Sequence, residues 1–574
     1  MNAVSITATI APGRRQLVNV RRQMLLTAKM RVVWLLVLFA MISACALLRI
    51  VLLGFLEPAG AGQSGFDAML PPRGDIVDRN GVPLARAFPA YSLWFNPKAM
   101  GDGGPPLVHT PAEVAAALMR IFPDEDPARL TARLASGDAG YLRRRILPEE
   151  ANKVHALGEP ALESPFETER LYPQGTMASH VLGFVAADGK GQVGMEQVFD
   201  QKLTDPATRG TPSVLSIDAR VQGALEDELD RGMRDTNAKG AAGIVLDVDT
   251  GEVLALASLP SFNPNLIDGA GAANIFNRAT NQVYELGSVM KPITVASAID
   301  AGTVTNLARR YPAGPLHIAN FTIHDDENLG PSLNVPEALI HSSNIVSAQV
   351  GDELGGARLS ATMRALGMNE RPYIELPARG FPLFPKGEWA RITTMTVSFG
   401  HGMAVTPLHL ACAYAALVNG GVWRPATLLK LNPGQVPQGR RVFKASTSAR
   451  MRQLLRMIVV DGTGRKADAP GFRVGGKTGS AEKAGAGGYH KSAVVATFAS
   501  AFPMDHPRYV VLAMLDEPQG TVASSFQRTA AWNAVPVVGR VIPRIGPLLG
   551  VMPDDSRDID ISDLSPLVGK GATE

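Results

Sequence analysis

Apolar residues gather in one long run near the start of the chain. Residues 32–48 read VVWLLVLFAMISACALL without a charge, and after Arg49 the apolar run continues to Leu56. As one helix, residues 32–56 rise about 37 Å at 1.5 Å per residue, enough to cross roughly 30 Å of hydrocarbon with some tilt. Arg49 stands near the far end, where its side chain can reach the interface. We therefore predict a transmembrane helix at 32–56.

The charges that precede this run predict its orientation. Six basic residues and no acidic residue come before it: Arg14, Arg15, Arg21, Arg22, Lys29 and Arg31. Basic residues flanking a span stay in the cytoplasm, so residues 1–31 would form a cytoplasmic tail and the rest of the chain would lie outside. A cleaved signal peptide has a shorter apolar stretch, although AGAGQSG at 59–65 resembles a cleavage site. A buried helix of a soluble protein fits the one-sided charge poorly.

Short elements separated by turns follow a small-residue linker at 57–65. PPRGDIVDRNGVPLA, residues 71–85, predicts two strands joined by an Asn-Gly turn. PAEVAAALMRIF has helical periodicity, and glycine interrupts the later segments up to TDPATRGTP. We place a domain boundary close to 210, which makes 57–210 the first domain beyond the anchor.

The pattern changes after this boundary. A helical segment is followed by AAGIVLDVDTGEVLALAS at 241–258, which predicts a hairpin around Asp-Thr-Gly. Near the end, two β-rich runs flank MDHP, and a last helical segment covers about 524–541. Hairpins that enclose helical segments predict an α/β fold, an α+β sandwich with a central antiparallel sheet and helices on its faces. Residues 551–574 are rich in Asp and Pro, so we expect a disordered tail.

Composition excludes several classes of function. A chain of 574 residues needs more than one core, and its net charge of +3 is small for that length. No basic block lies beyond residue 31, so we expect no nucleic-acid partner. Cys45 falls in the apolar run, so pairing with Cys412 is not expected, and no spacing of cysteine or histidine indicates a metal site.

The first candidate for chemistry is YELGSVMKPIT at 284–294, where Ser288 stands three positions before Lys291. On a helix these residues share one face. A serine hydroxyl needs a base to become a nucleophile, and a lysine is a base only if burial lowers its pKa. The apolar residues after Lys291 predict that burial. Taken alone, the pair is explained more simply as a capped helix with a surface lysine.

Two further stretches favour a catalytic role for Ser288 and Lys291 over the simpler structural one. HSSNIVSAQVG at 341–351 places Ser342 and Asn344 two apart, on one side of a loop. VGGKTGSAEK at 474–483 reads as a strand in which side chains alternate between faces. There Lys477 and Gly479 would share one face, and Thr478 and Ser480 the other. We expect Gly479 to let a substrate backbone approach the strand edge.

Together and in this order, the three stretches resemble the S-x-x-K, S-x-N and K-T-G motifs of the penicillin-recognising serine enzymes. The stretches RGDIVDRNG, YPQG, GMEQVFD, SFGHGMAVTPLHLACAYAALVNGG and VVDGTGRKA are similar to class B penicillin-binding proteins. GSVMKP and SSN resemble the division-specific, FtsI-type D,D-transpeptidases. Two residues depart from the family pattern: Ser480 replaces the usual threonine, and His401 stands where an aromatic residue is expected.

The resemblance implies a domain plan and a reaction. Residues 57–210 would be an elongated, dimerisation-type pedestal, and 211–550 the transpeptidase domain. Ser288 would attack the penultimate D-alanine of a peptidoglycan stem peptide, with Lys291 as base. Ser342 would pass a proton to the leaving amine, and Asn344 would position the peptide.

The resemblance also implies how the substrate is held. The backbone N–H groups of Ser288 and Ser480 would form the oxyanion hole. Lys477, Thr478 and Ser480 would hold the terminal carboxylate, and β-lactams would acylate Ser288. Neither metal nor cofactor is implied. The expected partners are glycan strands derived from lipid II, an FtsW-type glycan polymerase and other division proteins, at the bacterial inner membrane with the catalytic domain in the periplasm.

Two alternatives from other classes remain. A serine D,D-carboxypeptidase or β-lactamase would use the same motifs but pass the acyl group to water. The class A β-lactamases add a glutamate about 34 residues after S-x-N; here the nearest acid is Glu375, without the matching asparagine. The second alternative is a non-enzymatic scaffold or β-lactam sensor. The elongation branch of the family more often reads S-x-D at the second motif.

Overall fold

The structure is a computed structural model that describes residues 12–56, 72–101, 103–186, 188–267, 271–318, 320–485 and 488–568. The chain forms two compact units, Met1–Leu70 and Pro71–Glu574.

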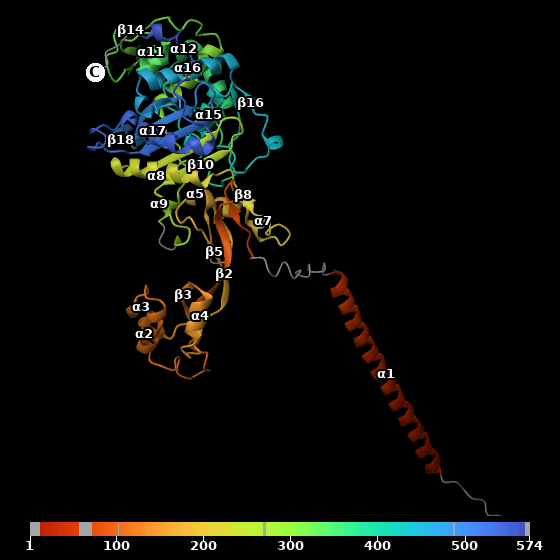
Figure 1. Ribbon diagram of the computed structural model, residues 1–574. Helices are drawn as coiled ribbons and strands as arrows, with labels where there is room; N and C mark the ends of the chain where they lie inside the picture. Colours follow the sequence, from red (N-terminus) through yellow and green to blue (C-terminus); the bar gives the residue numbers. More distant parts are fainter. Residues whose placement is uncertain are drawn as a thin grey trace, which may run out of the picture. The chain divides into compact units, whose positions relative to one another are not determined.

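The first unit contains one helix, α1, which runs from Pro12 to Leu56 (Figure 1). Within it, Leu26–Arg49 is long and apolar enough to cross a membrane. The side chains along this part are almost all exposed, which an apolar helix tolerates only among lipids or against a partner. The apolar helix is confirmed, but it begins well before residue 32, because the basic residues that precede the span are good helix formers. The predicted linker at 57–65 and residues 1–11 lie outside the described residues.

The second unit begins with a six-stranded sheet centred on the long strand β2, Pro83–Phe95. β2 pairs antiparallel with β1 (Ile76–Val77) through the predicted Asn-Gly turn, where Gly81 has a φ of +87°. β2 also pairs with β3, β4 and β5, and β1 pairs in parallel with β8 (Ser213–Val214), so this sheet extends past residue 210. The other elements of this region are α2 (Pro111–Ile121), α3 (Pro127–Ser136), β3 (Gly140–Ile146), α4 (Pro148–His155), β4 (Leu162–Glu163), β5 (Phe166–Leu171), α5 (Ser179–Leu182), β6 (Phe184–Val185), β7 (Gly191–Val193), α6 (Gly194–Val198) and α7 (Asp200–Thr204).

A buried ion network joins distant parts of this region. The Glu196 carboxylate is fully buried and accepts hydrogen bonds from Arg73 Nε at 2.8 Å and Arg170 Nε at 2.7 Å. Buried charges persist only when they are paired in this way. The network therefore fixes the start of the unit, strand β5 and helix α6 to one another.

The core of the rest of this unit is a five-stranded antiparallel sheet in the order β10-β9-β19-β18-β17. The two hairpins predicted from the sequence are β9–β10 and β18–β19, and both are confirmed. β17, which carries the K-T-G stretch, lies at one edge. The strands are β9 (Gly240–Asp247), β10 (Val253–Leu259), β17 (Gly475–Gly485), β18 (Gly488–Phe502) and β19 (Tyr509–Asp516).

Helices bury both faces of this sheet (Figure 1). In β19, Val511, Ala513 and Leu515 pack with α8 and α17, while Val510, Leu512 and Met514 lie in the core that contains α10, α15 and α16. Successive side chains of a strand point to opposite faces, so a strand covered on both sides is a continuous apolar run. This arrangement confirms the predicted sandwich. The helices are α8 (Ala219–Asp235), α10 (Lys291–Asp300), α15 (Pro407–Val418), α16 (Ala445–Asp461) and α17 (Ala534–Ile545).

The remaining elements lie between β10 and β17. They are α9 (Ala272–Ile275), β11 (Tyr311–Pro312), β12 (Leu316–Ile318), β13 (Phe321–Ile323), β14 (Ser332–Leu333), α11 (Val335–Ile340), α12 (Asn344–Leu354), α13 (Gly356–Ala365), α14 (Arg391–Ser398), β15 (Val422–Trp423) and β16 (Arg440–Arg441).

The end of the chain differs from the prediction in two ways. The last helix is α17, not 524–541, because residues after β19 turn sharply and Ser525 and Phe526 have positive φ. Residues 551–568 are ordered against the domain rather than disordered. Leu564 is buried, and Asp558 pairs with Arg456 of α16 at 2.7 Å. The acidic residues of the tail thus meet basic partners on the domain, which the composition of the tail alone did not indicate. Residues 569–574 lie outside the described part.

Candidate active site

Ser288 lies on a short 3₁₀ helix, Gly287–Met290 (η3), that continues directly into α10. The N–H of Lys291, the first residue of α10, donates to the carbonyl of Ser288. The two residues are therefore one turn apart, as the sequence predicts. Ser288 is half-buried and Lys291 is fully buried, so the hydroxyl can meet a substrate while the amine lies in the protein interior.

Glycines hold this turn against the edge strand. A Cβ on Gly479 would lie 2.3 Å from the carbonyl oxygen of Leu286, and one on Gly287 would lie 3.1 Å from that of Ser480. Gly479 therefore admits the backbone of the serine turn, and the approach of a substrate backbone at Gly479 remains a prediction. Behind the turn, the Tyr414 hydroxyl on α15 donates to the Val289 carbonyl at 2.8 Å. The positions of Ser288 and Ser480 are thereby fixed relative to each other.

The Lys291 amine contacts the second motif. Its Nζ donates to the carbonyl of Ser342 and lies 3.2 Å from the Ser342 Oγ. Burial lowers the pKa of Lys291 to about 7, although the carboxylates of Asp325 and Asp326 act in the opposite direction. A substantial fraction of this lysine is therefore neutral near pH 7. No hydrogen bond joins its Nζ to Ser288 among the described residues.

An aspartate that the sequence did not single out organises the second motif. Asp325 Oδ2 accepts a hydrogen bond from the Ser343 hydroxyl at 2.6 Å, and Oδ1 accepts from the N–H groups of Asn344 at 2.5 Å and Ile345 at 3.1 Å. A carboxylate at this position satisfies the free N–H groups of the first turn of α12. It also fixes the preceding residue, Ser342, whose φ is +62°.

The structure separates the two polar residues of the second motif. Ser342 meets Lys291, whereas Asn344 is the first residue of α12 and its Nδ2 donates to the His324 carbonyl at 3.1 Å. The HDDEN stretch at 324–328 supplies both His324 and Asp325. A polar loop of this kind gives no local sign that it will fold against the S-x-N residues.

The third motif contributes a second buried amine. Lys477 on β17 is fully buried, and its Nζ donates to the Thr478 carbonyl at 3.1 Å and lies 3.2 Å from the Thr478 Oγ1. Burial lowers the pKa of Lys477 well below its ordinary value, and the positive charge of Lys291 lowers it further. An anion placed beside Lys477 would favour the charged form of its amine.

The outer face of β17 is open at the same place. Ser480 is exposed, and its Oγ accepts a hydrogen bond from the Ala530 N–H at 3.0 Å. The Thr478 hydroxyl lies 2.7 Å from that of Thr463, which belongs to the VVDGTGRKA stretch and was not assigned a role from the sequence. An edge strand with an exposed face can accept an extended peptide alongside it.

His401, the departure from the family pattern, lies near the serine turn. Its ring centroid is 5.4 Å from that of Phe399. Burial lowers the pKa of His401; the Glu285 carboxylate raises it and the Lys291 charge lowers it. The histidine ring therefore packs beside Phe399, where the positive charge of Lys291 also acts on it.

Comparison with known proteins identifies the family to which this chain belongs. Residues 241–536 match the family described as "Penicillin binding protein transpeptidase domain", and residues 68–240 match "Penicillin-binding Protein dimerisation domain". The chain belongs to the penicillin-binding protein transpeptidase family. The two matched regions meet at residues 240 and 241, whereas the sequence analysis placed a domain boundary close to 210; the limits 57–210 and 211–550 remain predictions.

Curated relatives cover most of the chain. It is 40% identical over 503 residues to the "Probable peptidoglycan D,D-transpeptidase FtsI" of Caulobacter vibrioides, covering 86% of this chain and 84% of the relative. It is 31% identical to the "Peptidoglycan D,D-transpeptidase FtsI" of Escherichia coli (strain K12), covering 84% of each. Among solved structures, penicillin-binding protein 3 of Mycobacterium tuberculosis in complex with aztreonam has the same fold, with a TM-score of 0.66, 23% identity and coverage of 86% and 99%.

Proposed function

We propose that this chain is a serine-type peptidoglycan D,D-transpeptidase that cross-links stem peptides at the division septum. The observation that carries the proposal is the meeting of three separate motifs around one buried amine. Lys291 follows Ser288 by one turn, contacts Ser342, and interacts electrostatically with Lys477. The transpeptidase family match and the relatives named as FtsI-type D,D-transpeptidases support the same reaction.

In the first half of the reaction, the Ser288 Oγ attacks the carbonyl carbon of the penultimate D-alanine. Neutral Lys291 accepts the hydroxyl proton as the new C–O bond forms. The backbone N–H groups of Ser288 and Ser480 stabilise the oxyanion. The intermediate collapses with cleavage of the peptide C–N bond, and the leaving D-alanine amine receives the proton from Lys291 through the Ser342 hydroxyl. The product is an ester on Ser288.

In the second half, the amine of a neighbouring stem peptide attacks the ester. Lys291 and Ser342 remove its proton, the Ser288 C–O bond breaks, and the serine hydroxyl is restored with that proton.

Other residues hold the donor peptide before the terminal D-alanine leaves. Asn344 positions the peptide. Lys477, Thr478 and Ser480 hold the carboxylate of its terminal D-alanine, which supplies the opposite charge that the buried Lys477 amine lacks. Gly479 acts by letting β17 pack against the serine turn.

The structure disfavours rapid transfer of the acyl group to water by a class A mechanism. The acid in the corresponding stretch, Glu375, accepts hydrogen bonds from the Thr427 hydroxyl at 2.5 Å and from the Leu428 N–H at 2.8 Å. Its two oxygens thus join the segment around Glu375 to the buried segment at Thr427 and Leu428. They have a structural role and are not available to activate a water molecule beside Ser288.

Mass spectrometry of the purified protein with benzylpenicillin tests the proposed reaction. We expect one intact adduct per chain, located on Ser288 and persisting for many minutes, and none with Ser288→Ala. An adduct on another residue, or rapid hydrolysis of the drug, would refute the assignment. An acylated protein that forms no cross-linked product from lipid II and a glycan polymerase would favour the non-enzymatic scaffold.

We also propose the orientation and the partners of the chain. The basic residues before the apolar helix favour a cytoplasmic N-terminus and a periplasmic catalytic domain. Such an anchor would hold the enzyme beside an FtsW-type glycan polymerase, with the region at 57–210 contacting other division proteins. A reporter that is active only in the cytoplasm, fused after Gly65, should be inactive; an active one would reverse the topology.

A further inference from the structure

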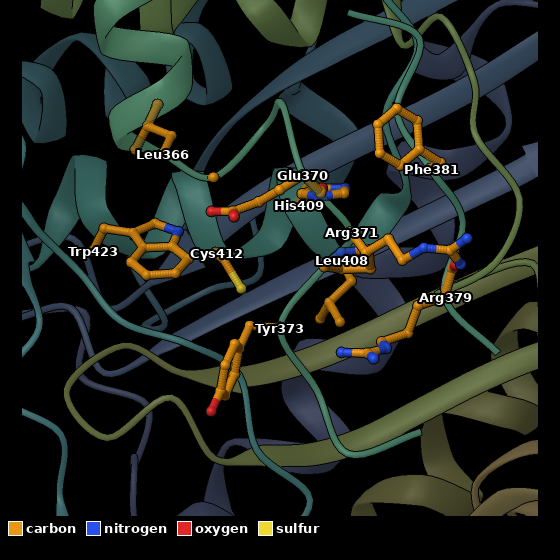
Figure 2. Close-up of a pocket in the computed structure, with 12 residues that line it drawn as sticks. Leu366, Glu370, Arg371, Tyr373, Arg379, Phe381, Leu408, His409, Cys412 and Trp423 are labelled. Atoms are coloured by element: carbon orange, nitrogen blue, oxygen red, sulfur yellow. The ribbon is translucent and has the colours of Figure 1, made fainter. Parts of the chain in front are cut away.

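A second pocket lies away from the three motifs. It has a volume of about 360 Å³ and lies between the α13–α14 connection, the first half of α15 and strand β15 (Figure 2). Small-molecule sites in proteins begin at about 300 Å³. None of the eight proposed site residues lines this pocket. It is therefore a separate space with its own chemistry.

Two buried donors line this pocket without an acceptor. The Arg379 Nε and the Trp423 Nε1 are inaccessible to solvent, and neither has a hydrogen-bond partner among the described residues. Buried N–H groups are nearly always paired, so an unpaired one indicates an absent water, ion or ligand. Both donors require an acceptor, and a carboxylate can accept from several donors.

The balance of charge in the pocket favours an anion. Its lining contains the guanidinium groups of Arg371 and Arg379 and only one carboxylate, that of Glu370. His409 also lines the pocket, but burial lowers its pKa to about 4, so it is neutral near pH 7. Its Nε2 is engaged with the Glu370 carbonyl at 2.9 Å. A ligand carboxylate at Arg379 would form a charge-assisted hydrogen bond.

The rest of the lining is apolar, and part of it is exposed in an unusual way. Tyr373 is 65% exposed and Phe381 is 63% exposed, although aromatic side chains are usually buried. Leu408 and Leu366 form other parts of the wall. In Figure 2 the guanidinium of Arg379 points toward the side lined by Tyr373 and Leu408. The charged group and the apolar surface can therefore contact one ligand.

The pocket is preformed. The segment that carries Arg379 and Phe381 is fixed on both sides by backbone hydrogen bonds, from the Gly380 N–H to the Thr280 carbonyl and from the Leu383 N–H to the Ala404 carbonyl, each 2.9 Å. The Arg371 guanidinium also donates to the Arg379 carbonyl. A rigid site loses less conformational entropy when a ligand binds.

We propose that this pocket binds a carboxylate that carries an aromatic or apolar group. The carboxylate accepts hydrogen bonds from Arg379, and the apolar group lies between Tyr373, Phe381 and Leu408. A free carboxylic acid and the acidic end of a peptide both present this chemistry. The site does not depend on the proposed transpeptidase reaction.

Saturation-transfer NMR with the detergent-solubilised full-length protein tests this site. The probes are 3-phenylpropanoate and its neutral counterpart 3-phenylpropanamide. We expect the acid to bind and the amide to bind at least about tenfold more weakly, as loss of one charge-assisted hydrogen bond implies. Prior acylation of Ser288 by benzylpenicillin, with the unreacted drug removed, should leave acid binding unchanged, because the acylated serine lies outside this pocket. Competition by a peptide ending in phenylalanine, but not by its C-terminal amide, would identify a peptide end as a ligand; failure to compete would favour a free small molecule.

Matched variants locate the site. Arg379→Gln should weaken binding of the acid by about tenfold or more, and Tyr373→Ala should weaken both probes. Arg358→Gln, an exposed position on α13 outside the pocket, should leave binding unchanged. Retained thermal stability shows that each variant is folded, and Tyr373→Ala serves if Arg379→Gln does not fold. Equal binding of acid and amide, loss of acid binding after Ser288 is acylated and free drug removed, or no binding to the unaltered protein would each overturn the proposal.

Discussion

At the scale of single residues, the site depends on a lysine that is buried rather than paired. Lys291 contacts a carbonyl and a hydroxyl of Ser342, and burial brings its pKa to about 7. The sequence predicted this burial from the apolar residues that follow Lys291. The carboxylates that oppose the shift could not be predicted, because Asp325 is far from Lys291 in sequence and reaches it only through the fold.

The first prediction concerns Lys291→Met. Methionine has nearly the same length and is apolar, so the fold should be kept, while the base is lost. We expect the rate of acylation by a fluorescent penicillin to fall by about 10²–10⁴, the usual contribution of a general base. In the unaltered enzyme the rate should rise with pH through about 7, because the neutral amine is the active form. A mutant with near-normal acylation would remove Lys291 from the mechanism.

The second prediction separates the two roles of Asp325. Asp325→Asn removes a negative charge near Lys291, so the pKa of the lysine should fall. The rise of the acylation rate with pH should therefore occur at lower pH. The substitution also disturbs the turn that holds Ser342, so the limiting acylation rate should fall by about tenfold, in the range that small misplacements cause.

Asp326→Asn is the control for this change. Asp326 also raises the pKa of Lys291, but no hydrogen bond joins it to the S-x-N residues in the described part of the chain. In this variant the rise of the acylation rate with pH should move to lower pH, and the highest acylation rate should stay unchanged. Similar limiting rates in both variants would argue against a positioning role for Asp325.

At the scale of helices and strands, the sequence predicted those elements that depend on the local sequence pattern. Both hairpins of the catalytic sheet and the first hairpin of the pedestal were predicted from β-rich runs around turn residues. The start of α17 was not, because the turn at 518–529 depends on contacts such as that between Ala530 and Ser480. The tail was misjudged for the same reason. Its apolar residues Ile559, Ile561 and Leu564 are few, but they pack against the core.

The third prediction tests the contact between β17 and the serine turn. Gly479→Ala places a methyl group 2.3 Å from the Leu286 carbonyl oxygen, and backbone must move to admit it. We expect a loss of about 1–3 kcal/mol in the free energy of unfolding, typical of overpacking, and slower acylation. Thermal unfolding and the penicillin assay measure these changes. Gly434→Ala, where no atom lies within 4 Å, should change neither. Unaltered acylation in Gly479→Ala would mean that this packing does not set the site.

At the scale of the whole molecule, the chain joins a catalytic domain to a single apolar helix. A helix that is long and apolar enough to cross a membrane would confine the enzyme to a membrane surface. The region at 72–210 presents no cluster of catalytic side chains among its described residues. Its buried network around Glu196 makes it a rigid element, suited to holding contacts with other proteins.

The last prediction therefore concerns the anchor and the pedestal together. If they hold the enzyme beside a septal glycan polymerase, depletion of the protein should give filaments with unfinished septa, and the tagged protein should gather at midcell.

Replacing Leu26–Arg49 by an unrelated span of the same length and orientation should preserve acylation of Ser288, because the catalytic unit is unchanged. The same replacement should fail to rescue the filaments, because the contacts within the membrane are lost. Full rescue would show that the helix is only a tether, and swollen or round cells on depletion would indicate a role in elongation instead.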